Sequence, residues 1–88
     1  MEWKVIVHRQ AAKDADRIRQ AGLEPQVKRL IALLRENPYQ VPPAYEKLSG
    51  ELSGFYSRRI SRQHRMVYTV DEETHTVRIQ SVWTHYER

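Results

Sequence analysis

Three strand-like segments follow one another closely in the second half of this 88-residue chain, and the short links between them limit the folds available. The segments are Gly54–Ile60, His64–Val70 and Thr76–His85, and their β-branched and aromatic residues are typical of strands. Residues 61–63 and 71–75 are the only links between them. A parallel pair needs a crossover connection of about a dozen residues or more, so links this short predict antiparallel neighbours.

The first half of the chain has the periodicity of one strand and two helices. Trp3–Val7 alternates and is predicted to be a strand. Apolar residues at helical spacing predict one helix over Gln10–Gln20 and a second that begins near Pro25 and ends at Asn37-Pro38. The proline-bearing segment Tyr39–Tyr45 is predicted to be an extended connection rather than a strand. The order β-α-α-β-β-β predicts an α+β domain with two N-terminal helices packed on one face of a twisted antiparallel sheet.

Alternation along the strands sorts the side chains by face. Ser57 shares a face with Arg59, whereas Arg58 lies on the opposite face. In the last predicted strand, Val82 interrupts the alternation, and a bulge there would re-aim His85.

Composition limits the chain to one small domain over residues 1–88, because 40% hydrophobic residues in this length fill only one modest core. The absence of cysteine excludes disulfides and thiolate metal sites, and no cofactor is expected. No apolar run approaches the roughly 20 residues of a membrane span, and the N-terminus lacks signal-peptide architecture, so a cytoplasmic protein is expected. A net charge of +4, carried mainly by arginine, favours an acidic protein or a nucleic acid as partner.

The chain from Glu46 onward contains the groups that a metal-free site for cutting RNA requires. Such a site must remove the proton of the 2′-hydroxyl, neutralise the phosphorane and protonate the departing 5′ oxygen. A carboxylate can be the base, arginines can stabilise the phosphorane, a histidine can be the acid, and aromatic rings can hold unstacked bases. These roles can be filled by Glu46, Arg59, Arg65, His85 and Tyr86.

The same residues also have structural interpretations. Glu46 resembles an exposed loop charge, and His85 lies near a chain terminus, where side chains commonly have no function. The arginines of the first hairpin also suit a solvated face, although their mutual repulsion favours an anionic partner; they are Arg58, Arg59, Arg62 and Arg65.

The other histidines are predicted to be structural. His8 is placed to cap the first helix, His64 belongs to a strand or turn, and His75 is predicted to be exposed in a turn. Tyr68 is predicted to lie in the core. Metal chemistry is disfavoured, because no histidine or carboxylate pair has ligand spacing.

Four segments carry a resemblance to a known family: Tyr45–Leu48, Glu51–Ile60, His64–Tyr68 and the late His85-Tyr86 pair. On these residues the chain resembles the YoeB/Txe branch of the RelE/ParE toxin superfamily, over essentially its whole length. The resemblance implies a RelE-like fold and a bacterial toxin of a type II toxin–antitoxin pair. It further implies a ribosome-dependent endoribonuclease that cuts mRNA in the A site by 2′-hydroxyl attack.

Site residues follow from the resemblance position by position. Glu46 corresponds to the general base, His85 to the general acid and Arg65 to the phosphate-stabilising arginine. Tyr86 corresponds to the tyrosine that organises the substrate base. Substrate contacts are expected from Arg59, Arg58 and Lys47.

The resemblance also implies partners, namely the ribosome with its mRNA and a YefM/Axe-like antitoxin whose acidic C-terminal segment folds over the arginines. Homodimerisation is a further implication. The chain departs from the usual pattern in three places: Glu87-Arg88 follow the His-Tyr pair, the hairpin between Val70 and Val77 is longer, and Tyr56 stands where tryptophan is common.

Two other functions remain open from the sequence. A ParE-like toxin shares the fold but inhibits a topoisomerase by binding, without catalysis. A plain ribosome- or RNA-binding module would need the arginines alone, without the pairing of Glu46 with His85.

Overall fold

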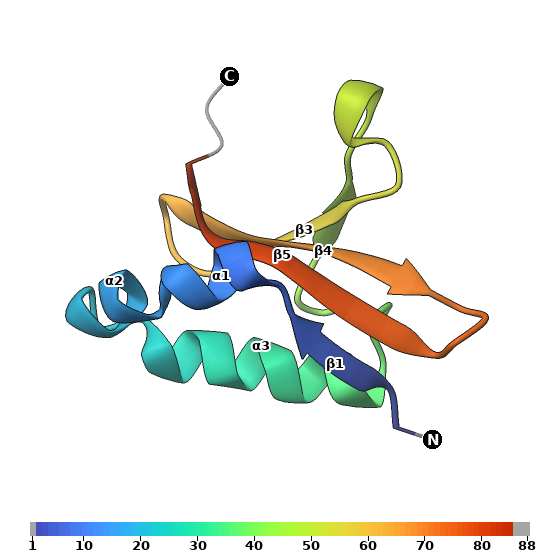
Figure 1. The fold of residues 1–88 in the computed structure, drawn as a ribbon, viewed down its shortest axis with the longest axis horizontal. Coiled ribbons are helices and arrows are strands. Elements are labelled where there is room, and N and C mark those ends of the chain that lie inside the picture. The colour runs from blue at the N-terminus through green and yellow to red at the C-terminus, as the bar shows by residue number, and fades with distance from the viewer. Residues whose placement is uncertain (1, 86–88) are drawn as a thin grey trace.

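The computed structural model describes the backbone of residues 2–85 and the side chains of residues 2–82. Over this range five strands form one sheet in the order β1-β5-β4-β3-β2, and the helices cover one face of it (Figure 1). The helices are α1 (Arg9–Lys13), α2 (Ala15–Gln20) and α3 (Glu24–Glu36), with a 3₁₀ turn, η1, at Gly50–Leu52. The strands are β1 (Lys4–Val7), β2 (Tyr45–Lys47), β3 (Tyr56–Arg59), β4 (His64–Asp71) and β5 (Thr76–His85). The α+β architecture is therefore as predicted.

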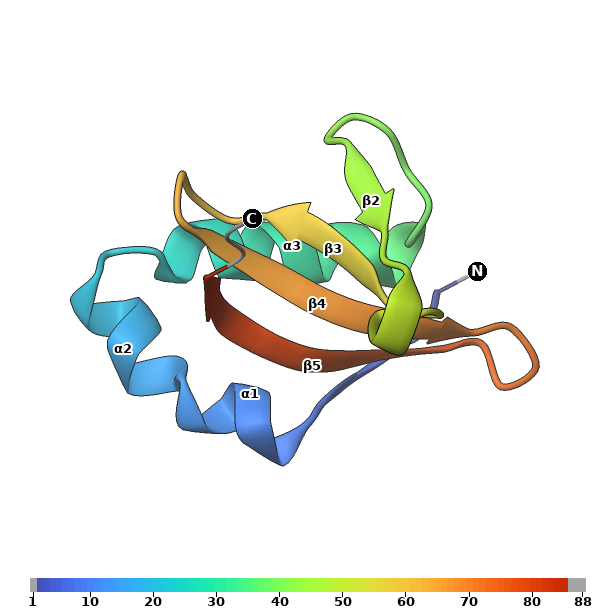
Figure 2. The ribbon, with the colours of Figure 1, turned by 90° about the horizontal axis from the view of Figure 1, so that it is seen from above.

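The sheet is antiparallel from β2 to β5, as the short links require. β1 is the exception, because it pairs with β5 in parallel, from Lys4 opposite Thr76 to Val7 opposite Ile79. The chain can place β1 in parallel because helices, rather than a hairpin, follow it. Figure 2 shows β3, β4 and β5 side by side, with α3 passing behind β3 and β4 and with α1 and α2 beside β5.

The predicted first helix is divided into α1 and α2. Asp14 lies between them with φ −86° and ψ 0°, and it ends one helix and precedes the next. The break keeps Ala11 and Ile18 buried against the sheet, so packing is preserved. His8 begins α1 as predicted, and its Nδ1 accepts a hydrogen bond from the Gln10 amide at 3.1 Å.

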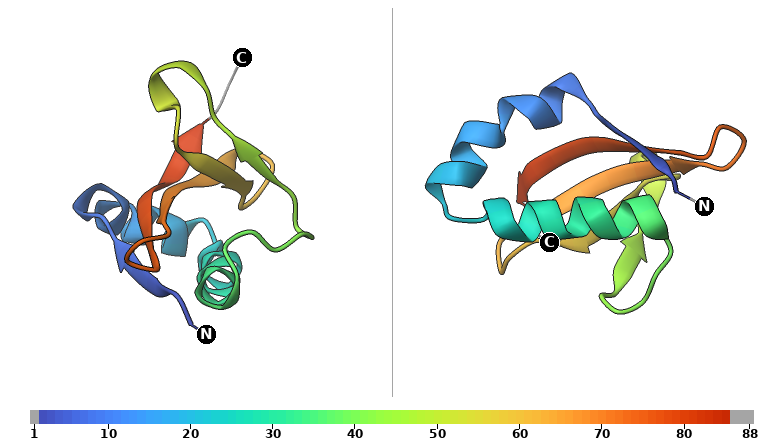
Figure 3. Two further views of the ribbon diagram at one scale, coloured as in Figure 1. Left: turned by 90° about the vertical axis from the view of Figure 1, so that its right-hand side faces the viewer. Right: turned by 90° about the horizontal axis from the view of Figure 1, so that it is seen from below.

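α3 supplies most of the helical part of the core. It begins with Glu24-Pro25, buries Leu30 and Leu34, and ends before Asn37, as the periodicity predicted. Figure 3 shows the helix running beneath the sheet. Sheet residues complete the core: Ile60, Met66, Tyr68, Val77, Ile79 and Val82.

Two local predictions need correction. Lys47 and its neighbours were not expected in a strand, yet β2 forms the edge of the sheet beside β3. His75 is half-buried instead of exposed, because its ring stacks on Trp3 with centroids 3.7 Å apart. The Lys4 amide also donates to the His75 carbonyl at 3.0 Å, which ties β1 to the turn before β5.

Candidate active site

Pairing of three strands brings the predicted site residues onto one face of the sheet. Glu46 on β2 lies opposite Ser57 on β3, and Arg59 on β3 lies opposite Arg65 on β4. Directly opposed residues of a sheet share a face, and so do residues two apart in a strand. Glu46, Ser57, Arg59 and Arg65 therefore face the same side.

Arg65 contacts two of these residues, Glu46 and Ser57. Its Nη2 lies 3.2 Å from Glu46 Oε1, and its Nε donates a hydrogen bond to Ser57 Oγ at 2.6 Å. The Arg65 side chain is 17% exposed, whereas the Glu46 side chain is 63% exposed. The guanidinium is thus held in place, while the carboxylate remains accessible to a ligand.

A hollow of about 320 Å³ opens beside this pair and is lined by Pro43, Ala44, Glu46, Arg59 and Arg65. Two guanidiniums and one carboxylate give this lining an excess of positive charge. A phosphate can accept hydrogen bonds from both arginines while the carboxylate accepts a proton nearby. The arrangement therefore suits acid–base chemistry on a phosphodiester.

The backbone of β5 brings His85 to the same end of the sheet. His85 lies opposite His64, and Thr84 lies opposite Arg65. The pairing between β4 and β5 shifts register between Arg65 and Val67 and again between Val67 and Tyr68, which is the irregularity that Val82 suggested. The His85 side chain and the whole of Tyr86 lie outside the described residues, so their roles stay predictions.

The comparison with known proteins decides the family. A model of the YoeB-like toxin of bacterial type II toxin–antitoxin systems matches residues 12–86. The chain belongs to this family.

Relatives in sequence agree with the YoeB-like assignment. The chain is 39% identical over 51 residues to Toxin YoeB of Mycobacterium bovis and 40% identical over 48 residues to Toxin YoeB of Escherichia coli K12. These matches cover 58% and 54% of the chain. The chain spans 60% of the length of the first relative and 57% of the second.

Solved structures of the family share the whole fold. A YoeB/ParE toxin from Agrobacterium tumefaciens superposes with a TM-score of 0.83 at 25% identity, covering 94% of this chain and 99% of that one. The YoeB dimer from Staphylococcus aureus gives a TM-score of 0.80 at 30% identity, covering 98% of this chain and 100% of that one. The YoeB–YefM complex from the same organism gives 0.77 with the same identity and coverage.

Arg58 does not join the other arginines of the candidate site. Its side chain is fully buried, on the face opposite Arg59, so it has no access to the hollow. Its guanidinium donates to the Tyr68 hydroxyl at 2.9 Å and to three backbone carbonyls at 2.6–2.9 Å, those of Pro43, Pro38 and Gln40. The structure gives Arg58 a structural role, and we leave it out of the proposed site.

Lys47 is also separated from the hollow. It is exposed on β2 and lies opposite Tyr56, so strand alternation directs it away from the face of Glu46. Ser57, in contrast, was not among the predicted site residues, and its hydroxyl accepts a hydrogen bond from Arg65. The sequence did place Ser57 on the same face as Arg59. A serine hydroxyl on a face with arginines can accept a hydrogen bond from a guanidinium, so this shared face could have indicated its role.

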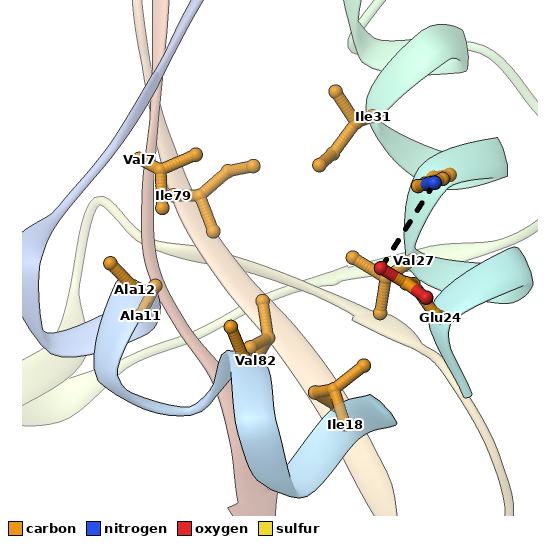
Figure 4. A pocket seen from close by; sticks show the side chains of 11 residues that line it. Val7, Ala11, Ala12, Ile18, Glu24, Val27, Ile31, Ile79 and Val82 are labelled. Atoms are coloured by element: carbon orange, nitrogen blue, oxygen red, sulfur yellow. Dashed lines mark ion pairs between the residues drawn. The ribbon is translucent and has the colours of Figure 1, made fainter. Parts of the chain in front are cut away.

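A different hollow of about 170 Å³ lies between the helices and β5 and is lined almost entirely by apolar side chains, including Val7, Ile31 and Val82 (Figure 4). Its polar rim is Glu24 with Lys28, whose charged atoms are 4.0 Å apart. This rim offers no counterpart to the paired arginines of the Glu46 hollow.

Neither a membrane-spanning helix nor a metal site is found in the described part of the chain. None of its helices has the length and apolar character needed to cross a bilayer. No three histidine, aspartate or glutamate side chains among the described residues converge as metal ligands.

Proposed function

We propose that the protein is an endoribonuclease that cleaves RNA by attack of the 2′-hydroxyl on the adjacent phosphate. The observation that carries this proposal is the Glu46–Arg65 pair in an open, positively charged hollow, with Nη2 and Oε1 3.2 Å apart. A base and a phosphate-binding group are thereby adjacent, as the reaction requires.

Substrate entry would separate this pair. The Glu46 carboxylate is mostly exposed, so its attraction to Arg65 is worth only about 0–1 kcal/mol and costs little to give up. A scissile phosphate would replace the carboxylate on Arg65, which Ser57 holds in position. Glu46 is then free to accept a proton.

The proposed reaction moves two protons and needs no further reactant. Glu46 takes the proton of the 2′-hydroxyl as its oxygen attacks phosphorus, and Arg65 with Arg59 stabilises the phosphorane. The bond from phosphorus to the 5′ oxygen breaks, and His85 protonates that oxygen. Tyr86 would position the base. The products are a 2′,3′-cyclic phosphate and a 5′-hydroxyl.

Membership of the YoeB-like family supports mRNA in the ribosomal A site as the substrate, and hence action in the cytoplasm. The solved YoeB–YefM complex of S. aureus supports a YefM-like antitoxin as partner of this chain. An acidic segment of that partner would neutralise Arg59 and Arg65 and block RNA. The solved YoeB dimer supports a homodimer as one state of the free toxin.

Programmed ribosomes with a defined mRNA test the proposal. We expect Glu46→Ala, Arg65→Ala and His85→Ala each to slow cleavage by about 10²–10⁴-fold, because each removes a proton-transfer or charge-stabilising group. Glu51→Ala is the matched control, since Glu51 is exposed in η1 and lies outside the hollow. Primer extension locates the cut, and analysis of its 3′ end identifies the cyclic phosphate.

Two outcomes contradict the proposal. Equal cleavage by wild type, Glu46→Ala and Arg65→Ala would remove these residues from the chemistry. Inhibition of DNA supercoiling by wild-type protein that cuts no RNA would support a ParE-like toxin instead.

A further inference from the structure

Another hollow with a polar rim, here called the second hollow, lies between α3 and the end of β3 and has a volume of about 210 Å³. α3 passes beneath β3 at this place (Figure 2). Leu30, Pro43 and Ile60 form an apolar floor, and the side chains at the rim are Gln26, Arg29 and Arg59. Nothing in the acid–base chemistry proposed above uses Gln26 or Arg29.

This hollow shares two lining residues with the Glu46 hollow. Pro43 and Arg59 line both, so Arg59 stands at the junction with Glu46 on one side and Arg29 on the other. Arg59 is therefore within reach of a ligand in either hollow.

The charge of the second hollow is uncompensated among the described residues. Two arginines belong to its lining and no carboxylate does. Arg29 and Arg59 are both exposed, and neither forms an ion pair with any residue that the structure describes. Two guanidinium forks in the lining of one hollow favour a phosphate, which each can bind through two hydrogen bonds.

Size and lining point to one nucleotide. The volume is below the range of about 300–1,000 Å³ that is typical of pockets for larger ligands. The apolar floor can take the face of an unstacked base, and the Gln26 amide can hydrogen-bond to its edge. An acidic peptide would also satisfy the arginines, but it would leave this floor without a matching group.

We propose that the second hollow binds the nucleotide next to the scissile linkage of the cleaved strand, with its phosphate between Arg29 and Arg59 and its base on Leu30, Pro43 and Ile60. The proposal rests on the RNA-cleaving function proposed above and extends it to a subsite on α3.

Removal of one base from the message tests this subsite. Programmed ribosomes carry either a normal mRNA or messages with a single abasic residue on the 5′ or the 3′ side of the cut. We expect Arg29→Ala to lower the rate on the normal message by about tenfold, because a bidentate contact is lost. On the abasic message that removes the bound base, wild type should be slow and Gln26→Ala, which removes the amide at the edge of that base, should add little further loss.

Arg35→Ala is the matched control, because Arg35 is an exposed arginine of the same helix outside the hollow. A normal rate for Arg29→Ala overturns the proposal, and so does an equal loss from Arg35→Ala. Equal slowing by Gln26→Ala on the normal and both abasic messages would show that Gln26 does not contact the base of either neighbouring nucleotide, and it overturns the proposal too.

A binding measurement keeps this test separate from the cleavage proposal. Fluorescence anisotropy follows single-stranded RNA whose scissile position carries a 2′-deoxy sugar and therefore cannot be cut. Loss of one phosphate contact should reduce the salt dependence of log K by about 0.7 for Arg29→Ala and leave it unchanged for Arg35→Ala. Wild type that binds in this way but cuts no message would refute the cleavage proposal alone, whereas unchanged salt dependence for Arg29→Ala refutes the subsite alone.

Discussion

Arg58 and Arg59 are neighbours on β3 with opposite environments. Arg58 is fully buried on the helix-covered side, and Arg59 is exposed at the junction of two hollows. The difference follows from strand alternation, which sends adjacent side chains to opposite faces. Residue type alone therefore says little about function here, since two identical side chains in succession have one structural and one ligand-facing position.

The buried Arg58 guanidinium is held by neutral hydrogen-bond acceptors and not by a carboxylate. Arg58 meets the Tyr68 hydroxyl and three carbonyl oxygens, and its guanidinium carbon lies 4.9 Å from the centre of the Tyr45 ring. Burial raises the pKa of Tyr68, while the nearby Arg58 charge acts in the opposite direction. Neutral acceptors thus hold the charge in place.

The buried side also supports the open one. The carbonyls that Arg58 holds belong to the connection between α3 and β2, and Arg58 lies opposite Tyr45 at the start of β2. Glu46 is the next residue. Arg58 therefore fixes the backbone from which the proposed base extends, although it never reaches the hollow.

The sharpest test of this comparison exchanges each neighbour for methionine. Arg58→Met leaves four acceptors without their donor, and two of them, the Tyr68 hydroxyl and the Pro38 carbonyl, are buried. At about 1–3 kcal/mol for each acceptor that water cannot reach, we expect a loss of about 3 kcal/mol or more in the free energy of unfolding. Arg59→Met should stay within about 0.5 kcal/mol of wild type, because its side chain is exposed. Urea unfolding followed by circular dichroism measures both.

Similar stabilities for the two variants would show that burial of Arg58 is energetically unimportant. For cleavage we expect a direct effect from Arg59→Met, although this variant loses little stability. Arg59→Met is expected to fold normally and to cut slowly, whereas any loss of activity in folded Arg58→Met should follow displacement of Glu46.

Much of this arrangement was accessible from the sequence. Short links predicted the antiparallel strands, and the spacing of Leu30 and Leu34 predicted α3. β2 was missed because the proline-bearing segment before it has no periodicity, and contacts from residues distant in sequence, such as Arg58 and Glu72, hold that segment. Such long-range contacts leave no local pattern.

The candidate site was predictable in part. Family resemblance supplied Glu46 and Arg65, and the structure places their charged atoms in contact. The family resemblance assigned substrate contacts to both Arg58 and Arg59, although strand alternation already placed them on different faces. The role of Ser57 depends on a side-chain rotamer of Arg65, which no sequence pattern specifies.

A smaller effect is expected from Ser57→Ala on the open side. The Arg65 Nε would lose its acceptor at 2.6 Å, which should cost about 1 kcal/mol of stability and slow cleavage about tenfold through kcat. Lysine has no Nε, so the loss of rate should nearly vanish when Ser57→Ala is made in an Arg65→Lys background. Equal losses in both backgrounds would show that Ser57 acts independently of Arg65.

The smallest expected effect concerns the pH dependence of the connection between α3 and β2. The Tyr39 hydroxyl donates to Glu72 Oε2 at 2.6 Å, and burial, followed by this carboxylate, raises the pKa of Tyr39 well above its ordinary value. Above pH 10 the unfolded chain loses this phenol proton while the folded protein keeps it, so stability must fall as pH rises. Tyr39→Phe should reduce that fall by about 0.5 kcal/mol between pH 8 and pH 10.5, allowing for solvent screening of the partly exposed pair.

Urea midpoints at the two pH values measure this change in the free energy of unfolding, with Tyr45→Phe as the control. An alkaline loss of stability unchanged by Tyr39→Phe would show that the Tyr39–Glu72 contact does not contribute to holding the helix connection against the sheet.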